Sequence, residues 1–286
     1  MIWFGKRRGY LSDWTTQMWV RATGRRVDLQ ESPWLAGPRG GTRCIGADFF
    51  EEYARSSGRE LVSSGAPRGL VRDLSEVTAG AHVDPKVADF YEQTSEYEMD
   101  CWSEWSAPFR PIGRLLAVLF SRRLEQLNVP LSGLDTSRGI TSRVLLLRGS
   151  EGEVETAWVR ELSALGRIIY AGSYSVCRLP GLPGPCVKVV FPLPNGRAIV
   201  FMRAEVQADG SLRLLSDGRG FGDPGFYFVV EGNGRAWARY VASMNETIHV
   251  YAAEGESVRT DHVLRIWGRT FLRLHYRLWR PPQERI

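Results

Sequence analysis

Apolar and polar residues alternate with a period of two through the second half of the chain, from Ile140 onward. Such alternation is typical of β-strands that bury one face. Turn sequences separate the apolar segments, and Asn195-Gly196 and Asn233-Gly234 supply the positive φ angles that tight hairpins need. The pattern predicts strands over residues 140–148, 152–162, 167–178, 186–191, 197–206, 211–216, 226–231, 235–241, 245–252 and 257–279.

A long antiparallel series with no helix between its strands leaves two exposed edges unless the sheet closes on itself. We therefore predict an α+β chain whose C-terminal part is a predominantly antiparallel β-barrel or a strongly curved sheet. At the level of the fold this arrangement is calycin-like: it resembles the ligand-holding barrels of the calycin group, and also curved-sheet cyclases and lipid-transfer domains. The Gly-x-Trp motif of lipocalins is absent from it. The resemblance implies an enclosed site for a small molecule.

The first part of the chain has no such alternation. Residues 1–80 are rich in Gly, Arg and Trp and lack sustained periodicity, which predicts an irregular arm with one short helix over residues 47–56. The tryptophans of this arm are expected to hold it against the rest of the protein, because large aromatic surfaces are costly to leave in water.

Two helices are predicted between the arm and the sheet. Asp84-Pro85 has the composition of a helix start, and apolar residues then recur every three or four positions as far as Trp105. This spacing predicts an amphipathic helix over residues 84–105, and a similar pattern predicts a second helix over residues 112–130. We expect two domains: an N-terminal arm and helical hairpin over 1–139, and an antiparallel β-barrel or curved-sheet ligand-binding domain over 140–286 on which they pack.

The composition argues against a disordered chain, a collagen-like fibre and a disulfide-stapled miniprotein. At 43% hydrophobic and 24% charged residues, the 286-residue chain has an ordinary globular composition. Its longest uninterrupted apolar run, Leu115 to Phe120, is far shorter than the ~20 residues of a membrane-spanning helix. The N-terminal residues do not resemble a secretory signal, so we expect no membrane span and a cytoplasmic location. The preference for arginine over lysine indicates a GC-rich bacterial genome.

No residue pattern predicts a cofactor or a metal ion. Cys44, Cys101, Cys177 and Cys186 form no C-x-x-C pair and no cluster with zinc-ligand spacing. The segment Gly220–Gly225 matches G-x-G-x-x-G, but a strand pattern follows it where dinucleotide binding requires a helix. We therefore expect a protein without a cofactor, whose cysteines are reduced.

The strongest candidate site lies on the predicted strand 245–252. Asn245, Thr247, His249 and Tyr251 share one face of this strand, and we predict that this face lines the barrel. An imidazole titrates near neutral pH and a phenol can donate a proton, so His249 and Tyr251 are candidates for acid/base catalysis.

Neighbouring strands complete the predicted site. The catalytic candidates there are His275, as a second imidazole, and Arg239, as a group that holds an anion. His82 and His262 are expected at the surface. The remaining candidate ligand-binding residues are aromatic: Trp158, Tyr170, Tyr174, Trp237 and Tyr240.

The favoured function is binding of a small apolar or amphiphilic molecule, with cyclase or isomerase chemistry by acid/base catalysis as an extension. An alternative is a non-catalytic scaffold, which would bind a protein partner through the acidic segment 84–105 and the Arg-rich segment 259–286. The third hypothesis is single-stranded nucleic-acid binding, because Arg and aromatic residues alternate over residues 262–279. A net charge of only +5 makes nucleic acid the least favoured partner.

The secondary structure of residues 262–279 decides between two arrangements of these charges. Arg265, Arg269, Arg273 and Arg277 recur every four residues, which in a helix would form a ladder opposite the acidic segment. Gly268 and the aromatic content favour a strand. Each residue advances farther along a strand than along a helix, so the arginines of a strand could face the acidic residues of a helix at only one or two positions.

Overall fold

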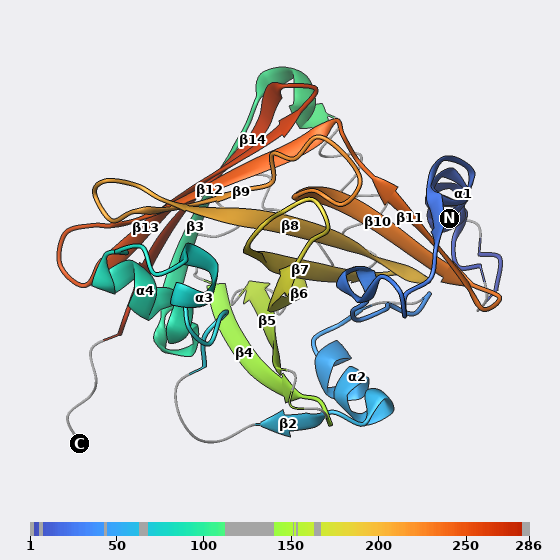
Figure 1. Cartoon of the computed structure of the whole chain (residues 1–286), viewed down its shortest axis with the longest axis horizontal. Coiled ribbons are helices and arrows are strands. Elements are labelled where there is room, and N and C mark those ends of the chain that lie inside the picture. Colours follow the sequence, from blue (N-terminus) through green and yellow to red (C-terminus); the bar gives the residue numbers. More distant parts are fainter. Residues whose placement is uncertain are drawn as a thin grey trace.

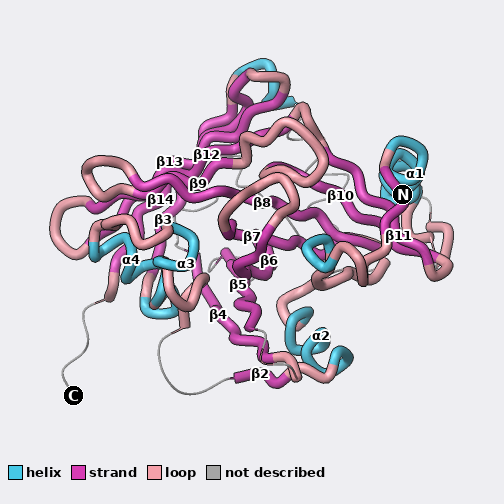
Figure 2. The backbone as a smooth tube through the Cα atoms, in the orientation of Figure 1, coloured by secondary structure: helices cyan, strands magenta, loops and turns pink. Residues whose placement is uncertain are grey.

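The computed structural model describes residues 3–5, 8–42, 45–62, 68–111, 140–150, 152, 154–162 and 167–281. Within them the chain forms one large antiparallel sheet that closes into a ten-stranded β-barrel, with four short α-helices around it. The predicted α+β barrel is thus confirmed. Figure 2 shows the strands as the body of the molecule and the helices at its periphery.

The strands of the second half agree with the predicted segments to within about two residues at each end, because alternation and turn residues are local signals. Three further strands, β1 to β3, come from the first half. The full set is β1 (Arg25–Val27), β2 (Glu60–Val62), β3 (Glu98–Trp105), β4 (Ile140–Arg148), β5 (Val154–Leu162), β6 (Arg167–Arg178), β7 (Pro185–Leu193), β8 (Gly196–Val206), β9 (Leu212–Leu215), β10 (Gly225–Gly232), β11 (Arg235–Tyr240), β12 (Met244–Ala252), β13 (Ser257–Ile266) and β14 (Arg269–Trp279).

The barrel ring runs β3-β4-β5-β6-β7-β8-β9-β12-β13-β14 and returns to β3. The long strand β8 makes this closure possible, because its two halves have different partners. Residues 196–201 pair with β10, whereas Arg203–Val206 pair with β9. The hairpin of β10 and β11, with β1 at its edge, therefore extends away from the ring and carries the N-terminal region (Figure 1).

Side chains fill the inside of the ring. The largest apolar cluster contains inward-facing residues of the barrel strands, such as Val200, Leu212, Val250 and Leu272. It also contains Phe90 and Tyr91, which enter from a cap outside the ring. A barrel interior packed with interlocking side chains is usual for a barrel of modest size. The interior is therefore both the main hydrophobic core and the place where polar side chains are most desolvated.

Within the described residues, four α-helices lie outside the ring. Helix α2 covers the outer side of β4 and β5, where Phe50 and Ala54 pack against Leu147 and Ala157. The short helices α3 and α4 cap one end of the barrel, and α1 lies beside β10 and β11 (Figure 1). None of the helices in the described part of the chain is long and apolar enough to cross a membrane. Their bounds are α1 (Leu11–Thr23), α2 (Phe49–Ser57), α3 (Ser75–Thr78) and α4 (Pro85–Glu92).

The predicted helix over residues 84–105 is wrong in its second half. Helix α4 begins as predicted, with Asp84 accepting the backbone N–H of Lys86, but it ends at Glu92, and residues 98–105 form strand β3. Tyr97, Cys101 and Trp105 are spaced four residues apart, and this spacing puts side chains on one face of a strand as well as of a helix. The period alone was ambiguous here. The predicted second helix, over 112–130, lies outside the described residues.

The N-terminal arm contains a helix that the sequence did not predict. The buried residues of α1 are Asp13, Gln17 and Val20, so its inner face is mostly polar. A search for an apolar inner stripe cannot detect such a helix. The short helix predicted at 47–56 is confirmed as α2.

The predicted strand over 257–279 is two strands, since Trp267 and Gly268 adopt φ angles of 49° and 75° and form a tight turn between β13 and β14. Strand β14 then pairs with β3, which sets Arg273 opposite Glu104 and Arg277 opposite Asp100. The acidic and basic segments therefore meet as neighbouring strands, with two arginines opposite two acidic residues in the register. The division of the chain at residue 139 stays a prediction, although β1, β2 and β3 precede it and pair with strands that follow it.

Candidate functional site

A guanidinium group lies inside the barrel. Arg160 on β5 is only 8% exposed and shares the inward face with Trp158, two residues earlier. Its Cζ atom lies 3.5 Å from the centre of the Trp158 ring and 5.1 Å from that of Tyr276 on β14. Both distances are within the range of cation–π attraction, which is strongest where water is excluded. The aromatic rings thus stabilise a positive charge at a position where burial would otherwise disfavour it.

Tyr276 connects this charge with a buried thiol. Its hydroxyl group hydrogen-bonds the Arg160 guanidinium and the Cys101 thiol of β3. Burial raises the pKa of Tyr276 far above its ordinary value, and burial raises the pKa of Cys101 to about 11. At neutral pH both groups are therefore protonated, so the cluster offers hydrogen-bond donors and a fixed positive charge but no thiolate nucleophile.

A buried histidine–carboxylate pair lies on the neighbouring strands. The His262 Nε2 atom of β13 is 2.8 Å from the Glu246 Oε2 atom of β12. Glu246 shares the inward face of β12 with Ile248 and Val250, which belong to the interior cluster. The ring of His262 lies 6.5 Å from that of Tyr276, so the pair adjoins the Arg160 cluster. The predicted surface position of His262 is wrong, because the residue lies in the middle of β13 and its side chain faces the interior beside Glu246.

We call these residues the interior polar cluster: Cys101, Arg160, Glu246, His262 and Tyr276. A buried group of donors, a cation and a histidine–carboxylate pair is the kind of arrangement found at binding and catalytic sites. This cluster was not predictable from the sequence pattern, because inward-facing polar residues break the apolar alternation only at single positions. The one available signal was that Arg160 and Glu246 stand at positions where that alternation predicts an apolar residue.

The predicted residues of β12 lie on the other face of the sheet. Glu246, Ile248 and Val250 face inward, so Asn245, Thr247, His249 and Tyr251 face outward. The prediction that they line the barrel is wrong by one residue of register, since successive side chains of a strand point to opposite faces.

On this outer face the structure does bring three of the predicted catalytic residues close together. Asp261 on β13 lies 2.6 Å from His275 Nδ1 and accepts a hydrogen bond of 3.2 Å from the Tyr251 hydroxyl. His249 lies directly opposite Asp261 in the strand register, and its Nε2 atom is 2.8 Å from the Ser211 hydroxyl. Burial, with a smaller contribution from Arg213, lowers the pKa of His249. A catalytic role for these residues stays a prediction.

The remaining predicted residues occupy two places. Trp158 and Tyr174 face the interior, where their ring centres are 5.8 Å apart, and Tyr170 stands opposite Arg160 in the register of β5 and β6. Strand β11 is outside the ring, so its candidates do not reach the interior. There Arg239 contacts the ring of Trp19, Trp237 lies under Arg21, and Tyr240 donates to the Gly218 carbonyl.

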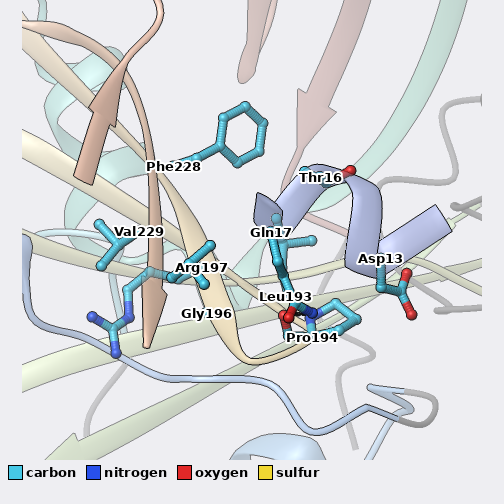
Figure 3. Close-up of a pocket in the computed structure, with 10 residues that line it drawn as sticks. Asp13, Thr16, Gln17, Leu193, Pro194, Gly196, Arg197, Phe228 and Val229 are labelled. Atoms are coloured by element: carbon cyan, nitrogen blue, oxygen red, sulfur yellow. Dashed lines mark hydrogen bonds between the residues drawn. The ribbon is translucent and has the colours of Figure 1, made fainter. Parts of the chain in front are cut away.

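A small pocket of about 60 Å³ lies on the outer side of the sheet, between α1 and strands β8 and β10. Figure 3 shows Gln17 and Thr16 of the helix on one side and Phe228 and Arg197 of the strands on the other. Pockets for organic ligands usually enclose about 300 Å³ or more, so this one is large enough for water only. Within the described residues, no three His, Cys, Asp or Glu side chains are grouped to hold a metal ion.

Comparisons with known proteins leave the family open. No family model and no solved structure matches the chain. The chain is 24% identical, over 247 residues and 82% of its length, to a protein of Bacillus subtilis (strain 168) named uncharacterized membrane protein YndJ. It spans 41% of that protein's length, so the similarity concerns only part of the longer relative.

Proposed function

We propose that the barrel binds a small amphiphilic molecule with an anionic end, such as a carboxylate, and that Arg160 holds that end. The observation that carries the proposal is the guanidinium group inside an aromatic cage at 8% exposure. A guanidinium pairs with carboxylate oxygens through two parallel hydrogen bonds, and such bonds are strongest where water is excluded. The apolar side chains around it would contact the rest of the ligand.

Side chains fill the closed barrel, so the ligand would enter as the cap moves outward. Phe90 and Tyr91 enter the barrel from α4, and the Phe90 ring is 6.5 Å from that of Trp158. Polar contacts at the rim hold the cap in place: Arg280 after β14 lies 2.8 Å from Asp89 and 3.0 Å from Glu96. Because exposed ion pairs contribute little stability, these contacts would not prevent the cap from moving. Outward movement of this eight-residue helix would expose the interior beside Trp158.

The test compares an anionic probe with its uncharged counterpart. Native mass spectrometry of the purified protein first shows whether a ligand copurifies. Binding of a dansylated fatty acid and of its methyl ester is then measured by fluorescence on the wild type and on Arg160→Met. We expect the wild type to favour the acid, and the variant to bind the acid at least about tenfold more weakly while retaining the ester.

Arg143→Met is the matched control. Arg143 lies on the outer face of β4, pairs with Glu51 and is 45% exposed, so its removal takes away an equal charge without touching the interior. The control should bind both probes like the wild type. Failure of the wild type to bind either probe, or equal loss of acid and ester in Arg160→Met, contradicts the proposal. Retained ester binding also shows that the variant is folded.

A second candidate is acid/base catalysis on the bound molecule, as in a cyclase or isomerase. The observation that favours it is the His262–Glu246 pair inside the barrel, next to Tyr276. A neutral imidazole that is oriented by a carboxylate can accept a proton, and a phenol can donate one. These two residues, rather than His249 and His275, would then carry the chemistry.

Ligands recovered from cells distinguish binding from turnover. The wild type and His262→Gln are purified from the same host, and their ligands are compared by chromatography and mass. Catalysis by rearrangement predicts ligands of equal mass but different retention in the two proteins. The same ligand in both proteins contradicts catalysis and leaves the binding proposal intact.

A further inference from the structure

The largest apolar side chains of helix α1 face outward, while its buried face is mostly polar and contains Val20 as its one fully buried apolar residue. Leu11, Met18 and Trp19 are 39%, 41% and 40% exposed, whereas Asp13 and Gln17 are buried at 4% each. A helix that packs on a protein core normally shows the opposite distribution. The exposed apolar face therefore needs an explanation other than packing within this chain.

Specific polar contacts hold the helix in this orientation. The Gln17 side chain donates to the Pro194 carbonyl at 3.2 Å and accepts from the Asn195 amide at 3.4 Å. Asp13 accepts the backbone N–H of Tyr10 at 3.1 Å. Beyond the last turn, a Cβ at Gly24 would approach the Ala238 carbonyl oxygen to 2.8 Å, so only glycine allows the chain to pass this close to β11. The helix cannot rotate its apolar face inward without losing these contacts.

Aromatic residues before the helix enlarge the exposed face. Trp3 and Phe4 are 39% and 43% exposed, and the Phe4 ring lies 6.2 Å from that of the half-buried Trp14. Trp19 continues the face to Phe228 on β10, at 6.0 Å between ring centres. We call this surface the α1 patch: Trp3, Phe4, Leu11, Trp14, Met18 and Trp19. Exposed apolar patches of this kind mark interaction sites.

Basic residues lie beside the α1 patch. Arg8 precedes the helix and is exposed, and Arg21 is in its last turn. The exposed Arg26 of β1 stands opposite Trp237, the residue under Arg21, and Arg239 of β11 contacts the ring of Trp19. The one acidic residue in this segment, Asp13, is buried under the helix. The patch therefore combines large apolar side chains, including three tryptophans, with a positive border.

We propose that the α1 patch docks on the surface of a bilayer that contains anionic phospholipid. Tryptophan and leucine side chains favour the boundary between headgroups and acyl chains, and arginine attracts anionic headgroups. A second copy of the chain would bring the same positive borders together, which disfavours self-association through this face. The proposal is independent of ligand binding inside the barrel.

Vesicle sedimentation tests the proposal. The wild type is mixed with vesicles of phosphatidylcholine that contain phosphatidylglycerol, and with vesicles of phosphatidylcholine alone. We expect stronger binding to the anionic vesicles, together with a blue shift of tryptophan emission. The double variant Leu11→Gln/Met18→Gln should bind the anionic vesicles at least about tenfold more weakly. Arg8→Gln and Arg26→Gln should each weaken this binding by about fivefold and leave binding to neutral vesicles unchanged.

Trp267→Gln is the matched control for lost apolar surface. Trp267 is 75% exposed at the turn between β13 and β14, which lies away from α1 in Figure 1, so its replacement should not change vesicle binding. Equal binding to both kinds of vesicle, or an equal effect of Trp267→Gln, overturns the proposal. Absence of vesicle binding with a dimer that Leu11→Gln/Met18→Gln disrupts also overturns it, in favour of a second copy. Arg160→Met should bind vesicles like the wild type, which separates this result from the function of the barrel.

Discussion

The two faces of strands β12 to β14 carry the same residue types in opposite surroundings. On the inner face, His262 pairs with Glu246, and their side chains are 15% and 7% exposed. On the outer face, His275 pairs with Asp261, and their side chains are 41% and 39% exposed. Each pair also has a tyrosine nearby, Tyr276 inside and Tyr251 outside.

The two pairs have the same kinds of group, a histidine and a carboxylate, and they differ because one is buried and the other is in contact with water. Asp261 and His262 are consecutive in the chain, as are His275 and Tyr276, and each pair of neighbours places one side chain on each face. The inner groups are desolvated, so the loss of one partner leaves the other without water to replace it. The outer groups keep water as an alternative partner.

The largest expected difference is in the cost of breaking each histidine–carboxylate pair. Glu246→Ala should lower the free energy of unfolding by about 3 kcal/mol, because it leaves His262 buried without its carboxylate. Asp261→Ala on the outer face should cost less than about 1 kcal/mol. Urea unfolding followed by circular dichroism measures both. Equal losses in the two variants would show that the two faces do not differ in effective burial.

The tyrosines should show a smaller difference in the same direction. Tyr276→Phe removes a buried hydroxyl that hydrogen-bonds Arg160 and Cys101, at a cost of about 1 to 3 kcal/mol. Tyr251→Phe removes a half-exposed hydroxyl and should change the stability by less than about 0.5 kcal/mol. The same unfolding experiment compares them. A larger loss in Tyr251→Phe would reverse the assignment of the inner and outer faces.

The smallest effect concerns the pH dependence of the outer face. The pKa of His249 is lowered, chiefly by burial, so it should titrate below the 6.5 of an ordinary histidine. The folded state then binds fewer protons than the unfolded state between the two pKa values. Its contribution to stability is complete above pH 6.5 and is lost as the pH falls through the folded pKa.

Nuclear magnetic resonance titration of the His249 ring measures this shift directly, and His249→Gln serves as the control that lacks it. In the control, the stability should depend less on pH below 6.5. A midpoint above 6.5 for His249 would contradict the direction of the shift and would indicate that Asp209 and Asp261 outweigh burial.

Much of the barrel was predictable from sequence, and much of the first half was not. The alternation from Ile140 onward and the turns at Asn195 and Asn233 located the strands, because both signals act within a few residues. Strand β3 was hidden by a spacing that suits both helix and strand. Helix α1 was hidden because its buried face is mostly polar and its largest apolar residues face outward.

The candidate site was only partly predictable. Trp158 and Tyr174 were identified and do lie inside the barrel, whereas Arg160, Cys101 and Tyr276 were not identified. Asn245, Thr247, His249 and Tyr251 were correctly grouped on one face, but the alternation of a strand is the same whichever face is inside. A polar residue in the interior cannot be recognised until its partners on distant strands are known.

The sequence by itself determined the strand segments, the hairpin turns and the sharing of faces along each strand, because these depend on neighbouring residues. Only the tertiary structure decided which face closes around the interior. That choice depends on pairings between distant segments, such as β3 with β14 and the two halves of β8 with different strands. Those pairings buried Glu246 and His262 together and left Asp261 and His275 in contact with water.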